Sequence, residues 1–306
     1  MGALWRRRAA RHVLAGLLPL LVAGAAVAAV LAVRLGDAAA PVREATGRAT
    51  ATVVGADGRE VELRWTDDRG TERVSRVRAA GGGEVPAGRT VTLRFDPADP
   101  SGPVYVAGDE PSARLRDLSF GLVLTLLVLA VAVAVTAVHL ARRRAAERRP
   151  AGPLPARYAR SRRGVVQRSW LVLTDGGTDW WVPVHWDPIL TRLAPGTRVP
   201  VHGRPGRDRV VVAEVDGVPV WQGGRRRPTA PAGELATAPV PPGEDPPRIG
   251  LVRHLRADGG LLAVAPLAGL LWAYLDGTGP AGWLAASAVA AGLLIWLPTV
   301  LGTDPT

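Results

Sequence analysis

Cysteine and lysine are both missing from the 306 residues of this chain. Without cysteine there is no disulfide framework, no thiol nucleophile and no thiolate metal site. All 38 basic residues other than histidine are therefore arginines, against 27 acids, and the sequence pI is about 11.4. Such a basic chain would ordinarily indicate nucleic acid as a partner. No recognisable nucleic-acid recognition module accompanies these arginines, so we expect no nucleic-acid binding.

Charged residues are also missing from several long apolar runs. Val13–Val33 is 21 residues without a charge, about 31 Å as a helix, which is enough to cross the hydrocarbon core of a bilayer. The chain should therefore be an integral membrane protein. Four transmembrane helices are predicted, at residues 13–35, 118–141, 259–275 and 280–301. The third is the shortest and contains Pro266.

Arginine placement predicts the orientation of these spans. Residues 36–117 hold 12 arginines and 14 acids, a net charge of −2, whereas residues 142–258 hold 21 arginines and 11 acids, a net charge of +10. Together with the basic N-terminus at residues 1–12, this bias places both termini and the second loop in the cytoplasm. We expect a multi-pass plasma-membrane protein. The alternative is a signal peptide cleaved after the alanine run 38–40, although the uncharged core is longer than usual for one.

The first loop has the pattern of a small extracytoplasmic β-domain over residues 41–110. Val61, Leu63 and Trp65 alternate with polar residues, which is the period of a strand with one buried face. Similar short segments recur, giving five strands in a barrel-like or sandwich-like arrangement. A further strand ends at Phe95, where two Asp-Pro pairs follow. We expect those aspartates to accept local backbone N–H groups and end the strand sharply.

The second loop predicts another five-stranded β-domain, over residues 160–224 and in the cytoplasm. Its most unusual segment is GGTDWWVPVHWDP, residues 176–188. Strand alternation puts Trp181 and His185 on one face, which is a candidate surface for a partner or the membrane if it is exposed. The opposite, core-facing residues are predicted to be Trp180, Val182, Val184 and Trp186. A proline-rich linker is expected to follow at residues 225–250.

The two loops can be aligned with each other. Residues 88–97 and 196–205 share the pattern G-x-x-V-x-V/L-x-x-x-P, and residues 66–77 match residues 174–184 with one deletion. One explanation is an internal duplication. The other is two independent β-domains that use the same turn residues.

Known catalytic and cofactor motifs are absent from the sequence. There is no phosphate-binding P-loop, no dinucleotide fingerprint and no nucleophile elbow. Asp175, Asp179, His185 and Asp187 have metal-ligand chemistry, but a single histidine among turn aspartates is ordinary for a hairpin. Asp96 and Asp99 could bind calcium, but ending the strand accounts for them without a ligand. We therefore assign no catalytic, cofactor-binding or metal-binding residue, no cofactor and no small-molecule substrate.

The segment Thr90–Pro100, TVTLRFDPADP, is similar to a motif of a known family. A span, a β-segment whose strand ends in V-x-V/L-x-Y/F-D/N-P-x-D-P, and a second span resemble the bacterial membrane-protein family called domain of unknown function 3592. The likeness covers residues 12–140. It implies an integral membrane protein with an exposed β-module and carries no catalytic residues. The second β-domain departs from the motif, with His202-Gly203-Arg204-Pro205 in place of the two Asp-Pro pairs.

These features favour a non-enzymatic envelope module that binds a partner or contributes to an assembly. The lipid bilayer is its first partner, and a protein partner or self-association through the spans is its second. A ridge of small residues, Gly282, Ala286 and Ala290, fits such helix packing. An accessory subunit of a transporter or membrane-bound enzyme is the alternative. A membrane-anchored hydrolase would require a nucleophile and base that the sequence does not offer.

Overall fold

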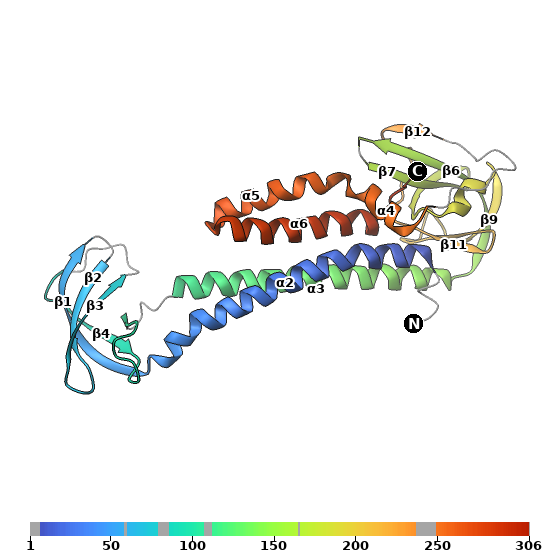
Figure 1. Ribbon diagram of the computed structural model, residues 1–306. Coiled ribbons are helices and arrows are strands. Elements are labelled where there is room, and N and C mark those ends of the chain that lie inside the picture. Colours follow the sequence, from blue (N-terminus) through green and yellow to red (C-terminus); the bar gives the residue numbers. More distant parts are fainter. Residues whose placement is uncertain are drawn as a thin grey trace. The chain divides into compact units, whose positions relative to one another are not determined.

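The computed structural model describes residues 7–57, 60–78, 86–106, 112–164, 166–236 and 249–305 (Figure 1). The chain divides into two compact units. One unit comprises Ala26–Leu126, and the other comprises Met1–Ala25 together with Leu127–Thr306. Two long helices, α2 (Arg8–Glu44) and α3 (Ser112–Glu147), each contribute to both units.

The first unit contains a five-stranded antiparallel sheet, as the sequence predicts. Its strand order is β3-β2-β1-β4-β5. The central strand β1 has a register shift between Val53 and Gly55, which is a β-bulge. The strands are β1 (Gly47–Asp57), β2 (Glu60–Thr66), β3 (Glu72–Arg78), β4 (Thr90–Phe95) and β5 (Tyr105–Val106).

The alternating residues of β2 form the centre of this domain. Val61, Leu63 and Trp65 are buried, while their neighbours along the strand are exposed or half-buried, so the predicted core face is confirmed. Trp65 packs against Phe95 of β4 and its indole N–H donates to Ser75 Oγ at 3.0 Å. Gly47 lies under the Phe95 ring, where a Cβ atom would come within 2.7 Å of ring carbons.

The Asp-Pro pairs end β4 in the way that the sequence predicts. The backbone N–H of Ala98 donates to Asp96 Oδ1 at 2.9 Å, and both the N–H and the hydroxyl of Ser101 donate to Asp99 Oδ1. Each aspartate thus closes a local turn, and the chain leaves the sheet there.

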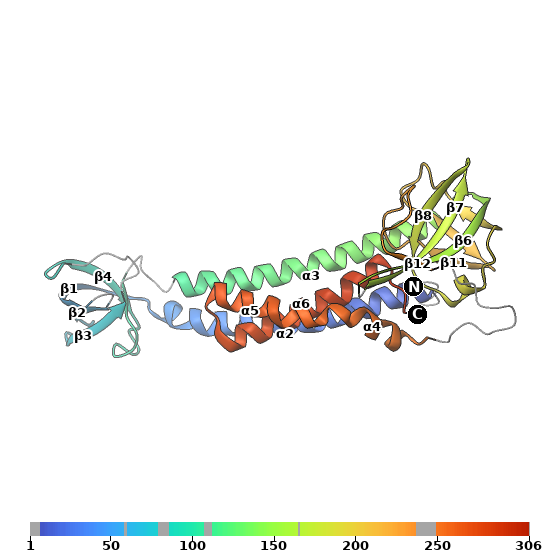
Figure 2. The ribbon, with the colours of Figure 1, turned by 90° about the horizontal axis from the view of Figure 1, so that it is seen from above.

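The second β-domain, in the other unit, has seven strands instead of the predicted five. Six follow the antiparallel order β11-β10-β9-β6-β7-β8, and β12 pairs with β6. The domain begins at residue 151 instead of 160, and the sheet curls into a half-barrel (Figure 2). The strands are β6 (Ala151–Arg163), β7 (Val166–Asp175), β8 (Thr178–Val184), β9 (Thr197–His202), β10 (Val212–Val215), β11 (Val218–Trp221) and β12 (Glu234–Ala236).

Part of the expected linker is attached to this sheet. Arg227 exchanges two backbone hydrogen bonds with Trp181, at 2.8 and 3.0 Å, and Glu234–Ala236 forms β12 against β6. The expectation of a free linker is therefore wrong at Arg227 and at residues 234–236, whose backbone groups pair with β8 and β6. Residues 237–248 of that linker lie outside the described residues.

The two sheets have the same strand order once the sequence alignment is applied. That alignment equates β2, β3 and β4 with β7, β8 and β9 in turn. Extending it by one strand at each end, the order β3-β2-β1-β4-β5 corresponds to β8-β7-β6-β9-β10. In each case a long helix precedes the sheet in the chain, α2 before β1 and α3 before β6.

Among the residues that the structure describes, three helices are long and apolar enough to cross a membrane: α2, α3 and α6 (Gly279–Leu301). The predicted fourth span, residues 259–275, is not confirmed as a continuous helix. It consists of a 3₁₀ segment, Gly259–Val264, and the 12-residue helix α5 (Ala265–Asp276), about 18 Å long. Pro266 at the start of α5 and the glycines before it account for the break. A fourth span exists only if Leu251–Ala257 and Gly259–Leu275, bent by 44°, are counted as one.

Helix packing in the second unit depends on glycines. A Cβ atom on Gly292 of α6 would lie 2.6 Å from Cα of Leu20 in α2, and one on Gly16 would lie 2.4 Å from Thr299 Oγ1. These glycines let α2 and α6 approach closely. Helices α5 and α6 lie side by side (Figure 1), and Gly269 makes the corresponding close approach between them. None of these three glycines belongs to the predicted ridge, whose Gly282 lies against Thr278 at the start of its own helix.

Candidate functional site

The buried guanidinium of Arg143 attaches the second β-domain to α3. Arg143 is only 6% exposed although it lies on a helix rich in arginine. Its Nε donates to the carbonyl of Gln222 at 2.5 Å, Nη2 to the carbonyl of Gly223 at 3.0 Å, and Nη1 to the carbonyl of His139 at 2.9 Å. A planar fork of donors suits this arrangement, because three acceptors in fixed directions are bound at once.

The Gln222 side chain holds the segment that follows β11. Its Oε1 accepts from the N–H of Val211 at 2.9 Å, and its Nε2 donates to the carbonyl of Gly224 at 2.7 Å. The adjacent Trp221 donates its indole N–H to Glu147 at the end of α3, at 2.6 Å. Side chains and backbone of this segment are therefore both fixed relative to α3.

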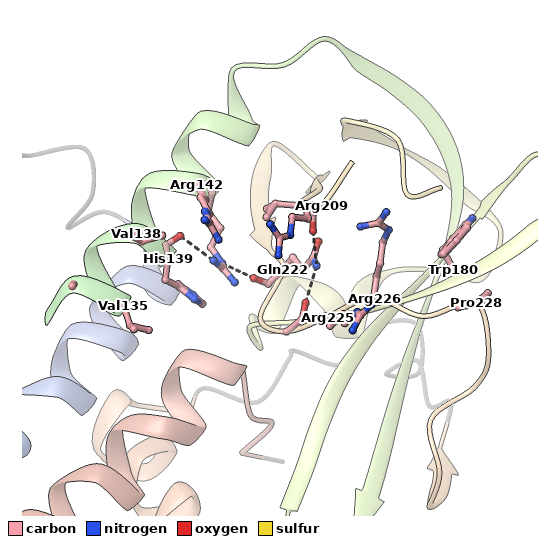
Figure 3. Close-up of a pocket in the computed structure, with 14 residues that line it drawn as sticks. Val135, Val138, His139, Arg142, Trp180, Arg209, Gln222, Arg225, Arg226 and Pro228 are labelled. Carbon is pink, nitrogen blue, oxygen red and sulfur yellow. Dashed lines mark hydrogen bonds between the residues drawn. The ribbon is translucent and has the colours of Figure 1, made fainter. Parts of the chain in front are cut away.

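A pocket with a volume of about 930 Å³ lies between α3 and this segment (Figure 3). In Figure 3, Val135, Val138 and Arg142 come from α3, and Arg209, Gln222 and Arg225 face them from the β-domain. The Arg226 guanidinium lies over the Trp180 ring at 5.6 Å from its centre, a cation–π contact. Burial lowers the pKa of Arg226, as does the charge of Arg225, while Asp208 opposes the shift.

Five arginines line this pocket, and no acid does. They are Arg142, Arg143, Arg209, Arg225 and Arg226. Within the described residues, none of the five forms an ion pair with a carboxylate. Asp208, the nearby acid, pairs instead with Arg149 at 3.3 Å. The pocket is therefore strongly positive, because no lining residue carries a negative charge.

Four of the five histidines come together beside Arg143. They come from α2, α3, the end of β8 and α4 (Leu251–Asp258), and each is at most 8% exposed: His12, His139, His185 and His254. The rings of His12 and His254 stack with centres 3.7 Å apart, and His139 Nε2 lies 3.2 Å from His185 Nε2. No group of three or more metal-binding side chains with suitable geometry occurs among the residues that the structure describes.

The end of α6 is fixed to the β-domain by Asp304. This carboxylate accepts hydrogen bonds from Tyr158 Oη at 2.7 Å and from Ser169 Oγ at 2.8 Å, and all three residues are buried. Burial, and then the charge of Asp304, raise the pKa of Tyr158. The serine hydroxyl and the phenol donate to the same buried carboxylate, so this group joins the residues after α6 to β6 and β7.

The aspartates of residues 175–187 have separate structural partners. Asp179 accepts from Thr174 Oγ1 at 2.7 Å and from Arg157 at 3.1 Å, and these two hydrogen bonds lower its pKa. Asp187 accepts from the N–H of Ile189 and caps the 3₁₀ helix Pro188–Arg192. His185 belongs to the histidine cluster instead, so the structure does not bring these residues together.

The predicted faces of the tryptophan-rich strand are partly wrong. Val182 and Val184 do enter the main core of the domain, but Trp180 is only half-buried and lines the pocket. On the opposite face, which the sequence left open as a candidate surface, Trp181 is buried at a ring-centre distance of 6.4 Å from Trp170. This face is covered, because the guanidinium of Arg157 lies over the Trp181 ring and that of Arg227 lies over the Trp170 ring. Beyond the strand, Trp186 packs against His254 and below Arg8.

The sequence contained one usable signal for the histidine cluster. His12, His139 and His254 each lie at the end of a predicted span, all on the side to which the arginine bias assigns the second β-domain. Helix ends on one side of a membrane are near each other, so their convergence was foreseeable. The pocket had no comparable signal, because its arginines come from three separate stretches of the chain, at 142–143, 209 and 225–226.

Comparisons with known proteins give this site no precedent: no family model, no curated protein and no solved structure matches the chain.

Proposed function

We propose that the chain is a non-enzymatic integral membrane protein that binds an anionic partner at the junction of its spans and its second β-domain. The observation that carries this proposal is the pocket lined by five arginines and no acid. Three of the five, Arg142, Arg209 and Arg225, are exposed, and like charges gathered in one pocket repel one another unless an anion binds among them. Guanidinium groups are also suited to bidentate binding of phosphate and carboxylate groups.

The proposed orientation places this pocket on the cytoplasmic side of a plasma membrane, with both termini there and the first β-domain outside. It is supported by the net charges of the two loops, −2 for residues 36–117 and +10 for residues 142–258. Reporter fusions at residue 75 and residue 240 should be active outside and inside the cell, respectively. The reverse pattern of activity would overturn the orientation.

We extend the proposal to the origin of the fold. An internal duplication of a unit made of one long helix and one five-stranded sheet is supported by the corresponding strand orders of the two domains. The first copy, α2 with β1 to β5, contains the motif that resembles domain of unknown function 3592, and the likeness itself covers residues 12–140. The second copy has two additional strands, β11 beside β10 and β12 beside β6, and it has the arginine pocket, so we assign the binding role to the second copy.

The binding role is tested by titrating the detergent-purified protein with pyrophosphate while following tryptophan fluorescence. Trp180 lines the pocket, so binding should change its emission. The double variant Arg209→Gln/Arg225→Gln should weaken binding about tenfold or more, because each arginine near an anionic group contributes about 1 kcal/mol.

A matched control removes the same charge elsewhere. Arg163 and Arg198 are exposed and do not line the pocket, so Arg163→Gln/Arg198→Gln should bind pyrophosphate like the original protein. Equal affinity of the two double variants would contradict the proposed function. If instead a second chain with enzymatic or transport activity copurified in a fixed ratio, the accessory-subunit alternative would replace it.

A further inference from the structure

The arginine pocket is continuous with an apolar surface of α3. Ala134, Val135 and Val138 line the same pocket as the arginines, and Val135 and Val138 are 42% and 45% exposed. Arg142 follows Val138 by one helical turn. One wall of the pocket is thus a hydrocarbon surface, and the arginines begin where that surface ends.

The apolar surface of α3 is not covered by the rest of the chain. Only 6% of the most apolar stretch of this span is buried within the described structure. Large apolar side chains stay exposed along its length, including Val123, Leu127 and Val131. In a membrane this surface contacts acyl chains, and the contact continues into the pocket at Val135 and Val138.

We infer that the pocket binds the headgroup phosphate of an anionic phospholipid, with an acyl chain lying along Ala134, Val135 and Val138. This assignment rests on the proposed function and names its anion. A free inorganic anion would satisfy the arginines but leave the apolar wall exposed to water. A zwitterionic lipid would cover the wall but bring a cation beside the guanidinium groups.

Charge and size both fit this occupant. The exposed guanidinium groups of Arg142, Arg209 and Arg225 have no carboxylate partner in the described part of the chain and present bidentate donors to phosphate oxygens. The half-buried ring of Trp180 has an apolar body and a polar N–H, which suits the boundary between headgroup and acyl chain. A volume of about 930 Å³ accommodates a headgroup together with the first part of one chain.

Brominated lipids provide a direct test, because bromine on an acyl chain quenches nearby tryptophan. The purified protein is reconstituted in nanodiscs of phosphatidylcholine, and a small fraction of the lipid is replaced by brominated phosphatidylglycerol or brominated phosphatidylcholine. Brominated phosphatidylglycerol should reach half-maximal quenching at a mole fraction about tenfold lower than brominated phosphatidylcholine does. Trp180→Phe should lose most of this lipid-specific part of the quenching.

Two helix variants separate lipid binding from simple anion binding. Ala134→Trp fills the apolar wall of the pocket. The quenching of Trp180 is obtained by subtracting the signal of the same protein with Trp180→Phe, and in the Ala134→Trp variant it should no longer differ between phosphatidylglycerol and phosphatidylcholine. Pyrophosphate binding should be unchanged. Ala137→Trp, equally exposed on α3 but outside the pocket, should keep the preference. Equal quenching by both lipids, or a preference that Ala134→Trp leaves intact, would overturn the lipid assignment. If the lipid assignment fails but pyrophosphate still binds through Arg209 and Arg225, the proposed function stands. If pyrophosphate does not bind either, the proposed function is contradicted as well.

Discussion

Arg143→Met is expected to lower the free energy of unfolding by about 2–4 kcal/mol, since each buried carbonyl that loses its donor costs about 1–3 kcal/mol. Three carbonyls lose a donor in this variant, on His139, Gln222 and Gly223. Removing a buried charge relieves part of that loss, because the guanidinium no longer has to be desolvated. The carbonyl term dominates, since methionine offers no hydrogen-bond donor at all.

The effect of Arg143→Met is measured by chemical denaturation in detergent and by trypsin cleavage. Because the chain has no lysine, trypsin cuts only after arginine, and faster cleavage at residues 225–227 would report separation of the β-domain from α3. Arg143→Lys should be intermediate, because an ammonium group keeps the charge but lacks the planar fork. Arg142→Met, exposed on the same helix, should stay within about 0.5 kcal/mol of the original. Equal losses in the Arg142 and Arg143 variants would show that the fork does not hold the domain.

Acidification from pH 7.5 to 5.5 is expected to destabilise the same junction through His185. Burial lowers the pKa of His185 well below 6.5, and the charges of Arg143, His139, His12 and His254 contribute in that order. The folded protein therefore keeps His185 neutral, whereas the unfolded chain binds a proton near pH 6.5. The stabilisation is complete above pH 6.5 and is lost as the pH falls below it, by up to about 1.4 kcal/mol per pH unit for one proton.

The pH dependence is checked by following unfolding midpoints between pH 7.5 and 5.5. His185→Asn should be less stable at pH 7.5 but should show a flatter decline, because one buried titrating group is gone. His202→Asn is the control, since His202 is the one histidine outside the cluster and instead approaches Glu214 at 3.7 Å. If His185→Asn and the original protein declined in parallel, another group would be responsible.

Strand alternation predicted the parts of the fold in which one face of a sheet is buried. Val61, Leu63 and Trp65 are such a case, and the five-stranded first sheet followed from similar segments. Strand β6 escaped prediction because Pro153 and Pro155 weaken the strand pattern, and no regular alternation of apolar residues compensates. The register of β6 is set by its pairing with β9, for example Leu154 opposite Val199. This pairing is visible only in the folded chain.

The candidate site was less predictable because long-range contacts create it. Nothing local distinguishes Arg143 from its neighbours Arg142 and Arg144, yet only Arg143 faces the carbonyls after β11. The burial of Trp181 has a related reason. Alternation assigns residues to the two faces of a strand, but it does not show whether other side chains, here those of Arg157 and Trp170, cover the second face.

The edges of the first sheet affect whether copies of this domain join when they come close together. An exposed strand edge presents unpaired N–H and C=O groups to which another chain can add as a further strand. Here the edge strand β3 carries Glu72, Arg73 and Arg76, with ion pairs from Glu72 and Arg76 back to β2. A second copy that paired with β3 would have to bring its own strand against these charges. Crowded copies should therefore remain separate at this edge instead of joining into a continuous sheet.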